Sequence, residues 1–343
     1  MFRRSGFIVT SLLLGGLTYA LLTTEMFITR RTNDHGEPPE THVTPERPET
    51  HVTPERPETH VTPERPETHV TPERTPESII EPRKPRDPEP IDPINPLKGY
   101  VGVPDESKQL NLSCGVCALV TGSGRMLNYK AGNEIDQADC VIRMNEGPVL
   151  GYEKHVGSKT TLRVMCFRSI YIAPINAAIY KGNSTLLGWG PPRDMDAKTG
   201  KAYQKLTELQ KSHPDMEVFK ITEERMQYAD RVFEKESGRA RKGTNTWLST
   251  GWFTMMVAME ICDVIKVYGM ASEDYCRNHP GDQTAYHYFT GARYRMEDYK
   301  ECSYQNWEQN ARAGGHRYLT EKSIFAHWAP LNNITFLNPS WDT

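Results

Sequence analysis

Two glycine-bearing turns, far apart in the chain, carry the residues best suited to bind a phosphate. The first turn, Thr121–Gly124, follows a short apolar run, and the second, Leu248–Gly251, precedes the apolar stretch Trp252–Asp263. A glycine turn beside an apolar segment brings backbone N–H groups close to a phosphate, above all where a helix begins. Ser249 and Thr250 are natural N-caps for such a helix. The sequence therefore predicts a phosphate site at these turns.

Longer motifs surround the two turns. They are Ile135–Asn145 and Val156–Thr161 after the first turn, Asn245–Gly251 at the second, and the histidine motifs Tyr286–Phe289 and His316–Glu321. In order and spacing these motifs resemble the large, small, third and last motifs of the animal sialyltransferases. The resemblance spans nearly all of residues 98–343. The run from Asn245 is most similar to that of the N-acetylgalactosaminide α-2,6-sialyltransferases that act on already sialylated Galβ1,3GalNAc.

The resemblance implies an inverting transfer of sialic acid from CMP-sialic acid to the GalNAc of sialylated Galβ1,3GalNAc. The acceptor glycan would belong to a glycolipid or an O-glycoprotein. His316 is the predicted catalytic base, because imidazole titrates near pH ~6.5 and can take the proton of the acceptor hydroxyl. The residues predicted to bind the donor are Ser123, Asn145, Ser249, Thr250, Gly251 and His287. Glu321 is expected to support His316 or its local fold.

No metal or other cofactor is expected. Many glycosyltransferases bind a metal through an Asp-x-Asp triplet, and this chain has one at Asp194–Asp196. CMP carries a single phosphate, so the leaving group needs no cation to neutralise a diphosphate. We therefore interpret the triplet as part of a solvated loop.

Three positions depart from the family pattern. Gly122 lies where some members have an asparagine that faces the donor, and His155 replaces an aspartate before Val-Gly. Cys166 lies where related enzymes have an asparagine or a small residue. These departures bring donor contacts at these three points into question.

The resemblance also implies how the seven cysteines pair. The family bond between the large and small motifs corresponds to Cys117 with Cys262, and analogy suggests Cys276 with Cys302. Cys114 with Cys140 is then the remaining candidate pair, which leaves Cys166 free. In the chain-entropy model a bond closing more than 100 residues stabilises the fold by roughly 4–5 kcal/mol.

Short apolar, β-branched runs alternate with helical patterns beyond the first hundred residues. The expected strands are 118–121, 140–144, 162–165, 185–189, 218–221 and 265–268, and amphipathic helical stretches include 202–210 and 222–234. Alternation of this kind favours an α/β fold with a mainly parallel sheet covered by helices, and the family resemblance implies the Rossmann-like (GT-A-like) fold of the sialyltransferases. Ligands of such folds bind beyond the carboxyl ends of the strands.

The first hundred residues contain no such core. Residues 1–5 are expected to form a cytoplasmic tail and residues 6–24 a transmembrane signal anchor, at the short end of the length that spans a bilayer. Residues 25–97 read as a disordered stem, because a nine-residue repeat from Thr41 supplies only valine as an apolar side chain. The alternative is that the histidines of the repeat bind a metal, but a flexible tract does not hold ligands in a fixed geometry. The catalytic domain, residues 98–343, would then lie in the Golgi lumen as part of a single-pass type II protein.

Two further features fit the secretory pathway. Asn-x-Ser/Thr patterns occur at Asn111, Asn183 and Asn333, and they matter only in that compartment. All seven cysteines lie beyond residue 110, as expected for an oxidising environment.

Composition excludes one class of partner. The net charge is −3, and nucleic-acid binding, which needs a clustered positive surface, gains no support. The oligomeric state stays open. The alternatives are a sialyltransferase of α-2,3 or α-2,8 linkage, an inactive glycan-binding protein with the same motifs, and a membrane-tethered mucin-like ligand.

Overall fold

The computed structural model describes residues 95–180, 183–241, 243–244, 246–289, 299–303, 308 and 315–341. The predicted tail, anchor and almost all of the stem lie outside these residues, as does Asn245. Within the described part of the chain, every helix is too short or too polar to cross a bilayer.

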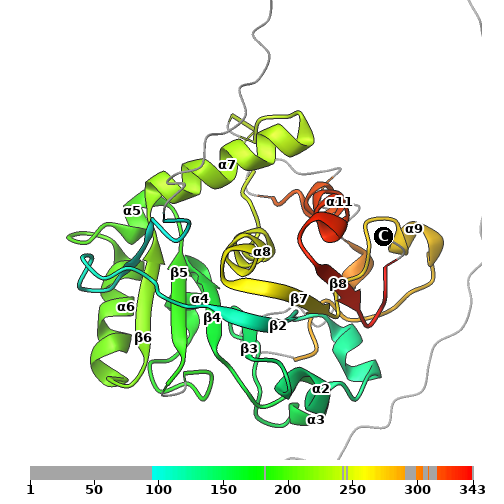
Figure 1. The fold of residues 1–343 in the computed structure, drawn as a ribbon, viewed down its shortest axis with the longest axis horizontal. Helices are drawn as coiled ribbons and strands as arrows, with labels where there is room; N and C mark the ends of the chain where they lie inside the picture. The colour runs from blue at the N-terminus through cyan, green and yellow to red at the C-terminus, as the bar shows by residue number, and fades with distance from the viewer. Residues whose placement is uncertain are drawn as a thin grey trace, which may run out of the picture. The chain divides into compact units, whose positions relative to one another are not determined.

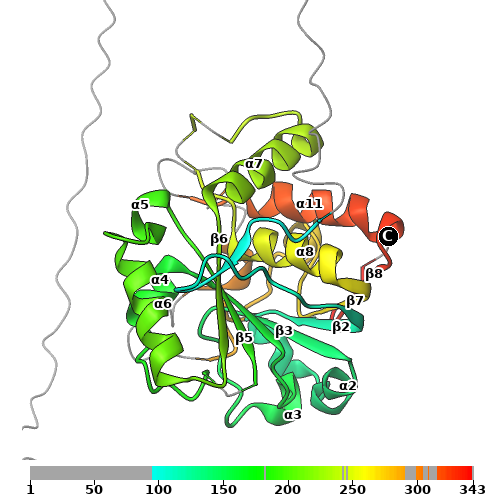
Figure 2. The same ribbon diagram turned by 60° about the vertical axis from the view of Figure 1, so that its left-hand side comes forward.

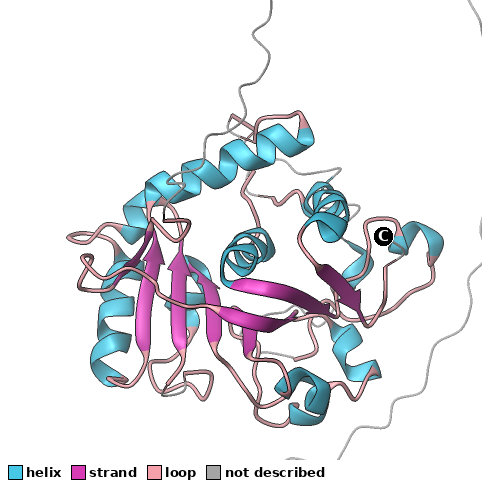
Figure 3. Cartoon of the chain, in the orientation of Figure 1, coloured by secondary structure: helices cyan, strands magenta, loops and turns pink. Residues whose placement is uncertain are grey.

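The described strands form one sheet in the order β1-β6-β5-β4-β3-β2-β7-β8 (Figure 1, Figure 3). Their bounds are β1 Tyr100–Gly102, β2 Cys114–Val120, β3 Cys140–Met144, β4 Leu162–Cys166, β5 Thr185–Trp189, β6 Glu217–Ile221, β7 Cys262–Tyr268 and β8 Ile334–Leu337. Neighbouring strands are parallel, except that β1 runs antiparallel to β6. The predicted α/β class and all six predicted strands are confirmed. The short edge strands β1 and β8 were not predicted.

Helices cover both faces of the sheet. Their bounds are α2 Gly132–Asp136, α3 Glu153–Val156, α4 Phe167–Ile172, α5 Pro192–Met195, α6 Lys201–Ser212, α7 Glu223–Ser237, α8 Thr250–Ile261, α9 Tyr275–Asn278 and α11 Tyr318–Trp328, with 3₁₀ turns η1 Gly124–Asn128, η2 Glu301–Ser303 and η3 Ala329–Leu331. Figure 2 shows α8 between the sheet and the helices α7 and α11. On the opposite face α4 and α6 pack over β4, β5 and β6. The predicted helices 202–210 and 222–234 correspond to α6 and α7.

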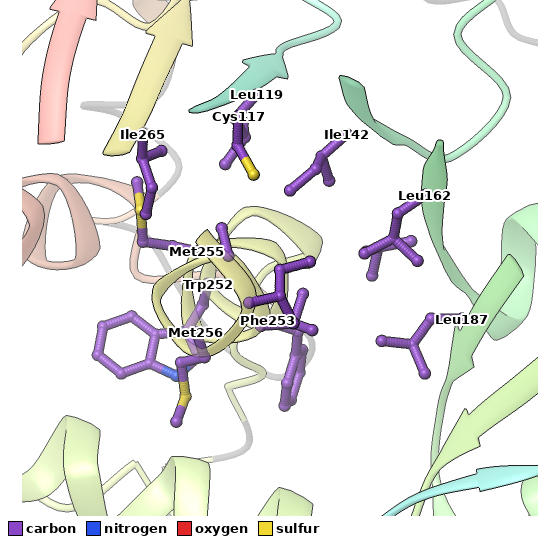
Figure 4. Close-up of a cluster of buried hydrophobic side chains, with 14 of the residues drawn as sticks. Cys117, Leu119, Ile142, Leu162, Leu187, Trp252, Phe253, Met255, Met256 and Ile265 are labelled. Carbon is purple, nitrogen blue, oxygen red and sulfur yellow. The ribbon is translucent and has the colours of Figure 1, made fainter. Parts of the chain in front are cut away.

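Helix α8 is apolar on all sides because it is buried on all sides. Leu119, Ile142 and Leu162 reach it from three strands (Figure 4). On the side away from the sheet, the Trp252 ring lies 5.0 Å from that of Trp328 on α11. Phe253, Met256, Val257 and Ile261 of this helix are all buried.

Three disulfides join the pairs expected from the family resemblance, and Cys166 is free. The bond between Cys117 and Cys262 spans 145 residues of sequence and ties β2 to β7. Cys262 directly follows α8, so this bond also fixes the end of that helix against the sheet. The cluster of three buried cysteines beside it is committed to disulfides and offers no free thiolate.

The chain changes direction across the sheet between β2 and β7. Strands β3 to β6 follow β2 on one side, whereas β8 lies beyond β7 on the other. The loops that leave the carboxyl ends of β2 and β7 therefore diverge. In parallel α/β sheets such a switch point leaves a crevice for a ligand.

Candidate active site

A cavity of about 290 Å³ lies at this switch point. It is bounded by the loops after β2, β3 and β7, the start of α8 and one side of α11. All seven residues predicted to act on the donor or the acceptor line it: Ser123, Asn145, Ser249, Thr250, Gly251, His287 and His316. The fold thus brings together motifs that are separated by almost 200 residues of sequence.

The first glycine turn packs directly against a histidine. The Nδ1 atom of His287 lies 3.2 Å from the carbonyl oxygen of Gly122, and the N–H of Tyr288 donates to the same oxygen at 2.8 Å. A Cβ added at Gly122 would come within 2.8 Å of His287 Nδ1. The departure from the family pattern at Gly122 therefore makes room for this imidazole.

A buried ion pair supports the same turn. The Oγ atom of Ser123 accepts from the N–H of Arg125 at 3.1 Å and donates to Glu301 at 3.1 Å. Glu301 also forms an ion pair with Arg125 at 2.6 Å, and Arg125 forms a second one with Asp282 at 2.7 Å. Burial alone would lower the pKa of Arg125, but the two carboxylates outweigh it and raise that pKa.

The second turn has a similar serine but a different support. Ser249 caps α8, with its Oγ accepting from the N–H of Trp252 at 3.1 Å. Glu321 binds Ser249 through two hydrogen bonds: one carboxyl oxygen accepts from the backbone N–H at 2.8 Å, and the other hydrogen-bonds the hydroxyl. Burial raises the pKa of Glu321 to about 8. Of the two expected roles of Glu321, support of His316 itself or of its local fold, these contacts show the second.

His316 is fixed by the chain segment just before this cap. Its Nδ1 lies 2.8 Å from the carbonyl oxygen of Trp247, and the N–H of Trp247 donates to Gly315 at 2.9 Å. A carbonyl can only accept, so Nδ1 carries the proton and the lone pair is on Nε2. Burial, aided by the positive charge of Arg168, lowers the pKa of His316. A neutral imidazole with an open Nε2 is the form that a base requires.

Asn145 connects the loop after β3 to the second turn. It follows β3 with a φ of 47°, a conformation that asparagine tolerates better than most residues. Its Oδ1 accepts from the N–H of Cys166 at 3.0 Å and from the hydroxyl of Thr250 at 3.5 Å. Arg163 binds the carbonyl oxygen of Asn145 at 2.7 Å. The position of this amide is thus set by β3, β4 and α8 together.

Other residues of the large motif hold the loop rather than line the cavity. Asp136 accepts from the backbone N–H groups of Ser158 and Lys159 at 2.8 and 2.9 Å. The buried guanidinium of Arg143 binds the carbonyl oxygens of Gly157 and Lys159 at 3.2 and 2.7 Å. These contacts hold the loop before β4 in place, and this gives a structural reason for the spacing of the motif.

Sequence reasoning missed three charged residues that line the cavity: Lys322, Glu301 and Glu146. Tyr318, Glu321, Lys322 and Phe325 line it from one side of α11, as their helical spacing allows. Burial lowers the pKa of Lys322 to about 8, and Glu301 opposes that shift. Glu301 and Glu146 also line the cavity. Lys322 adjoins the predicted Glu321, but no motif in the sequence singles out Glu301.

The other noted positions lie away from the cavity lining. His155 places its Nδ1 2.6 Å from the carbonyl oxygen of Tyr129. Asp196 accepts hydrogen bonds from Lys198 and Thr199, and Asp194 hydrogen-bonds Tyr171. Both carboxylates of the Asp-x-Asp triplet are thus engaged in hydrogen bonds with other residues of the protein.

Comparison with known proteins agrees with this site. A family model described as glycosyltransferase family 29 (sialyltransferase) matches residues 95–327. The human alpha-N-acetyl-neuraminyl-2,3-beta-galactosyl-1,3-N-acetyl-galactosaminide alpha-2,6-sialyltransferase is 40% identical over 251 residues, 72% of this chain and 82% of that protein. Human alpha-N-acetylgalactosaminide alpha-2,6-sialyltransferase 3 is 38% identical over 253 residues, 73% and 81%. The crystal structure of a mammalian sialyltransferase shares 20% identity and a TM-score of 0.41, covering 65% of this chain and 68% of that one.

The mainly parallel sheet, covered by helices and with a cavity at its switch point, defines a protein of the α/β class. Within that class the chain belongs to glycosyltransferase family 29, the sialyltransferases. It is a glycosyltransferase.

Proposed function

We propose that the chain transfers sialic acid from CMP-sialic acid to the 6-hydroxyl of the GalNAc in sialylated Galβ1,3GalNAc. The observation that carries this proposal is the convergence of both glycine turns and both motif histidines on one cavity. The printed names of the human relatives supply the α-2,6 linkage and, in one of them, the sialylated acceptor. The proposed acceptor glycan belongs to a glycolipid or an O-glycoprotein.

The proposed reaction is a single in-line displacement. The acceptor oxygen forms a bond to the anomeric carbon of sialic acid while the bond from that carbon to the phosphate oxygen breaks. CMP leaves with the electron pair, and Nε2 of His316 takes the hydroxyl proton. The N–H groups at the start of α8, with Ser249 and His287, stabilise the phosphate charge as it develops. Attack opposite the leaving group inverts the anomeric centre.

The proposed cellular location is the Golgi membrane, with one N-terminal helix in the bilayer and the catalytic domain in the lumen. Two observations support it: the apolar segment within residues 6–24, and three disulfides in the catalytic domain. Disulfides persist in oxidising compartments and are rare in the cytosol.

The function is tested with the full-length chain and labelled CMP-sialic acid. Acceptors are glycolipids and O-glycopeptides carrying Galβ1,3GalNAc, each with and without a terminal sialic acid. Mass spectrometry with linkage analysis is expected to show one new sialic acid on C6 of GalNAc, formed faster on the sialylated acceptors. Products linked α-2,3 or α-2,8 would overturn the linkage. Release of CMP without any glycosylated product, or no release at all, would overturn the transfer.

A further inference from the structure

The three Asn-x-Ser/Thr patterns occupy equivalent places in the fold. Asn111 lies just before β2, Asn183 just before β5 and Asn333 directly before β8 (Figure 1). These strands all run in the same direction. The three asparagines therefore lie at the amino-terminal edge of the sheet, whereas the cavity lies at the carboxyl-terminal edge. The seven residues of β2 separate the two edges by about 20 Å.

Each asparagine can carry a glycan in the folded chain. All three are exposed. Asn183 and Asn333 adopt φ values of 59° and 51° at turns that lead into their strands. The Nδ2 atom of Asn333 donates to the carbonyl oxygen of Asp263 at 3.3 Å. A glycosylated amide nitrogen keeps one hydrogen, so that contact can survive.

We infer that Asn111, Asn183 and Asn333 are N-glycosylated and form a glycan-covered edge opposite the active site. In the transfer, the amide nitrogen forms a bond to C1 of the N-acetylglucosamine of a lipid diphosphate oligosaccharide. The bond from C1 to the diphosphate breaks, the lipid diphosphate leaves with the electron pair, and the amide loses one proton. Thr185 of the second pattern is buried in β5, so transfer at Asn183 precedes completion of the sheet.

This arrangement has a functional consequence. N-glycans are bulky and solvated, and at this edge they leave the cavity open to an acceptor that is itself part of a large molecule. The inference rests on the proposed lumenal location and not on the proposed reaction.

The test uses the full chain expressed in animal cells. Partial digestion with peptide N-glycosidase F is expected to give three mass steps. Asn111→Gln, Asn183→Asp and Asn333→Asp are each expected to remove one step, and aspartate suits the left-handed conformation at the last two positions. Fewer than three steps would overturn the assignment. Protease treatment of sealed microsomes separates the causes: a protected chain without glycans contradicts the inference, and a degraded one contradicts the location.

A matched control adds a glycan close to the first turn of the cavity. Asn128 is exposed at the end of η1, directly after the first turn, and Lys130 is exposed as well. Lys130→Thr completes a pattern at Asn128 without touching the cavity lining. We expect this variant to gain one mass step and to lose about tenfold or more in turnover of protein-linked acceptor, whereas loss of the three natural glycans changes turnover by less than about twofold. If a variant glycosylated at Asn128 turned over the acceptor as fast as the wild type, the proposed importance of keeping glycans away from the cavity would be overturned.

Discussion

The two halves of the cavity use the same chemical parts. On the β2 side, Ser123 binds Glu301, and His287 faces the carbonyl oxygen of Gly122. On the α8 side, Ser249 binds Glu321, and His316 faces the carbonyl oxygen of Trp247. Each serine also accepts from the backbone N–H of a residue that follows it. Burial lowers the pKa of both histidines.

The halves differ in whether a cation balances the charge of the buried glutamate. Glu301 has the guanidinium of Arg125 at 2.6 Å. Burial raises the pKa of Glu301, and the charges of Lys322 and Arg125 oppose that rise. Among the described groups that shift the pKa of Glu321 there is no cation, and burial raises that pKa to about 8. The difference indicates that cations balance the charge of Glu301, whereas Glu321 has no such cation among its described partners and is protonated at mildly acidic pH. One half is thus an ion-paired anchor and the other a neutral hydrogen-bonded one.

The largest expected effect tests this difference directly. Glu301→Gln removes the charge from a buried ion pair and is expected to lower the free energy of unfolding by about 3 kcal/mol or more. Glu321→Gln replaces a protonated carboxyl by an amide of similar shape and is expected to cost about 1 kcal/mol or less at pH ~6. Urea unfolding with the disulfides intact gives both values. A similar cost for the two variants would remove the distinction between the halves.

The second effect tests the proposed base, His316, against an exposed histidine that lies outside the cavity lining. His316→Ala removes the proposed base and is expected to reduce turnover by about 10² or more, while the affinity for CMP stays close to that of the wild type. The exposed His279, whose Nδ1 lies 2.9 Å from the carbonyl oxygen of Tyr275, is the matched control, and His279→Ala should leave both quantities unchanged. Wild-type turnover in His316→Ala would exclude it from the mechanism.

The third effect is the pH dependence of stability. The pKa of Glu321 rises from its ordinary 4.5 to about 8 on folding, so the folded state holds a proton that the unfolded state releases. The stabilisation is complete below pH ~4.5 and is lost as the pH rises toward ~8, by at most about 1.4 kcal/mol per pH unit. The advantage of the wild type over Glu321→Gln should therefore shrink between pH ~5 and ~8. An advantage that is constant or grows over this range contradicts a protonated Glu321.

The smallest expected effect concerns metal ions. The carboxylates in both halves are engaged with serines, and those of the Asp-x-Asp triplet are engaged with other residues of the protein. Initial rates measured with EDTA are therefore expected to equal those without it. Complete loss of activity that Mn²⁺ restores would show that a cation takes part in the reaction.

The sequence by itself determined the class of the fold and the motif residues that line the cavity. Periodic apolar runs predicted six of the strands, because alternation with helices leaves few arrangements other than a parallel sheet. The motifs identified Ser123, Ser249 and both histidines, since glycine turns and helix caps leave local signals. The disulfide pairs followed from family resemblance.

Only the tertiary structure decided which groups meet beneath the turns. Glu301 and Arg125 carry no signal of a pairing in the sequence, because an ion pair depends on where distant segments fold. The partner of Glu321 shows the same limit: Glu321 follows His316 by five positions in one motif, yet its carboxyl reaches Ser249, 72 positions away. Spacing along a chain specifies faces of helices and strands, whereas burial and charge balance arise only when these faces pack together.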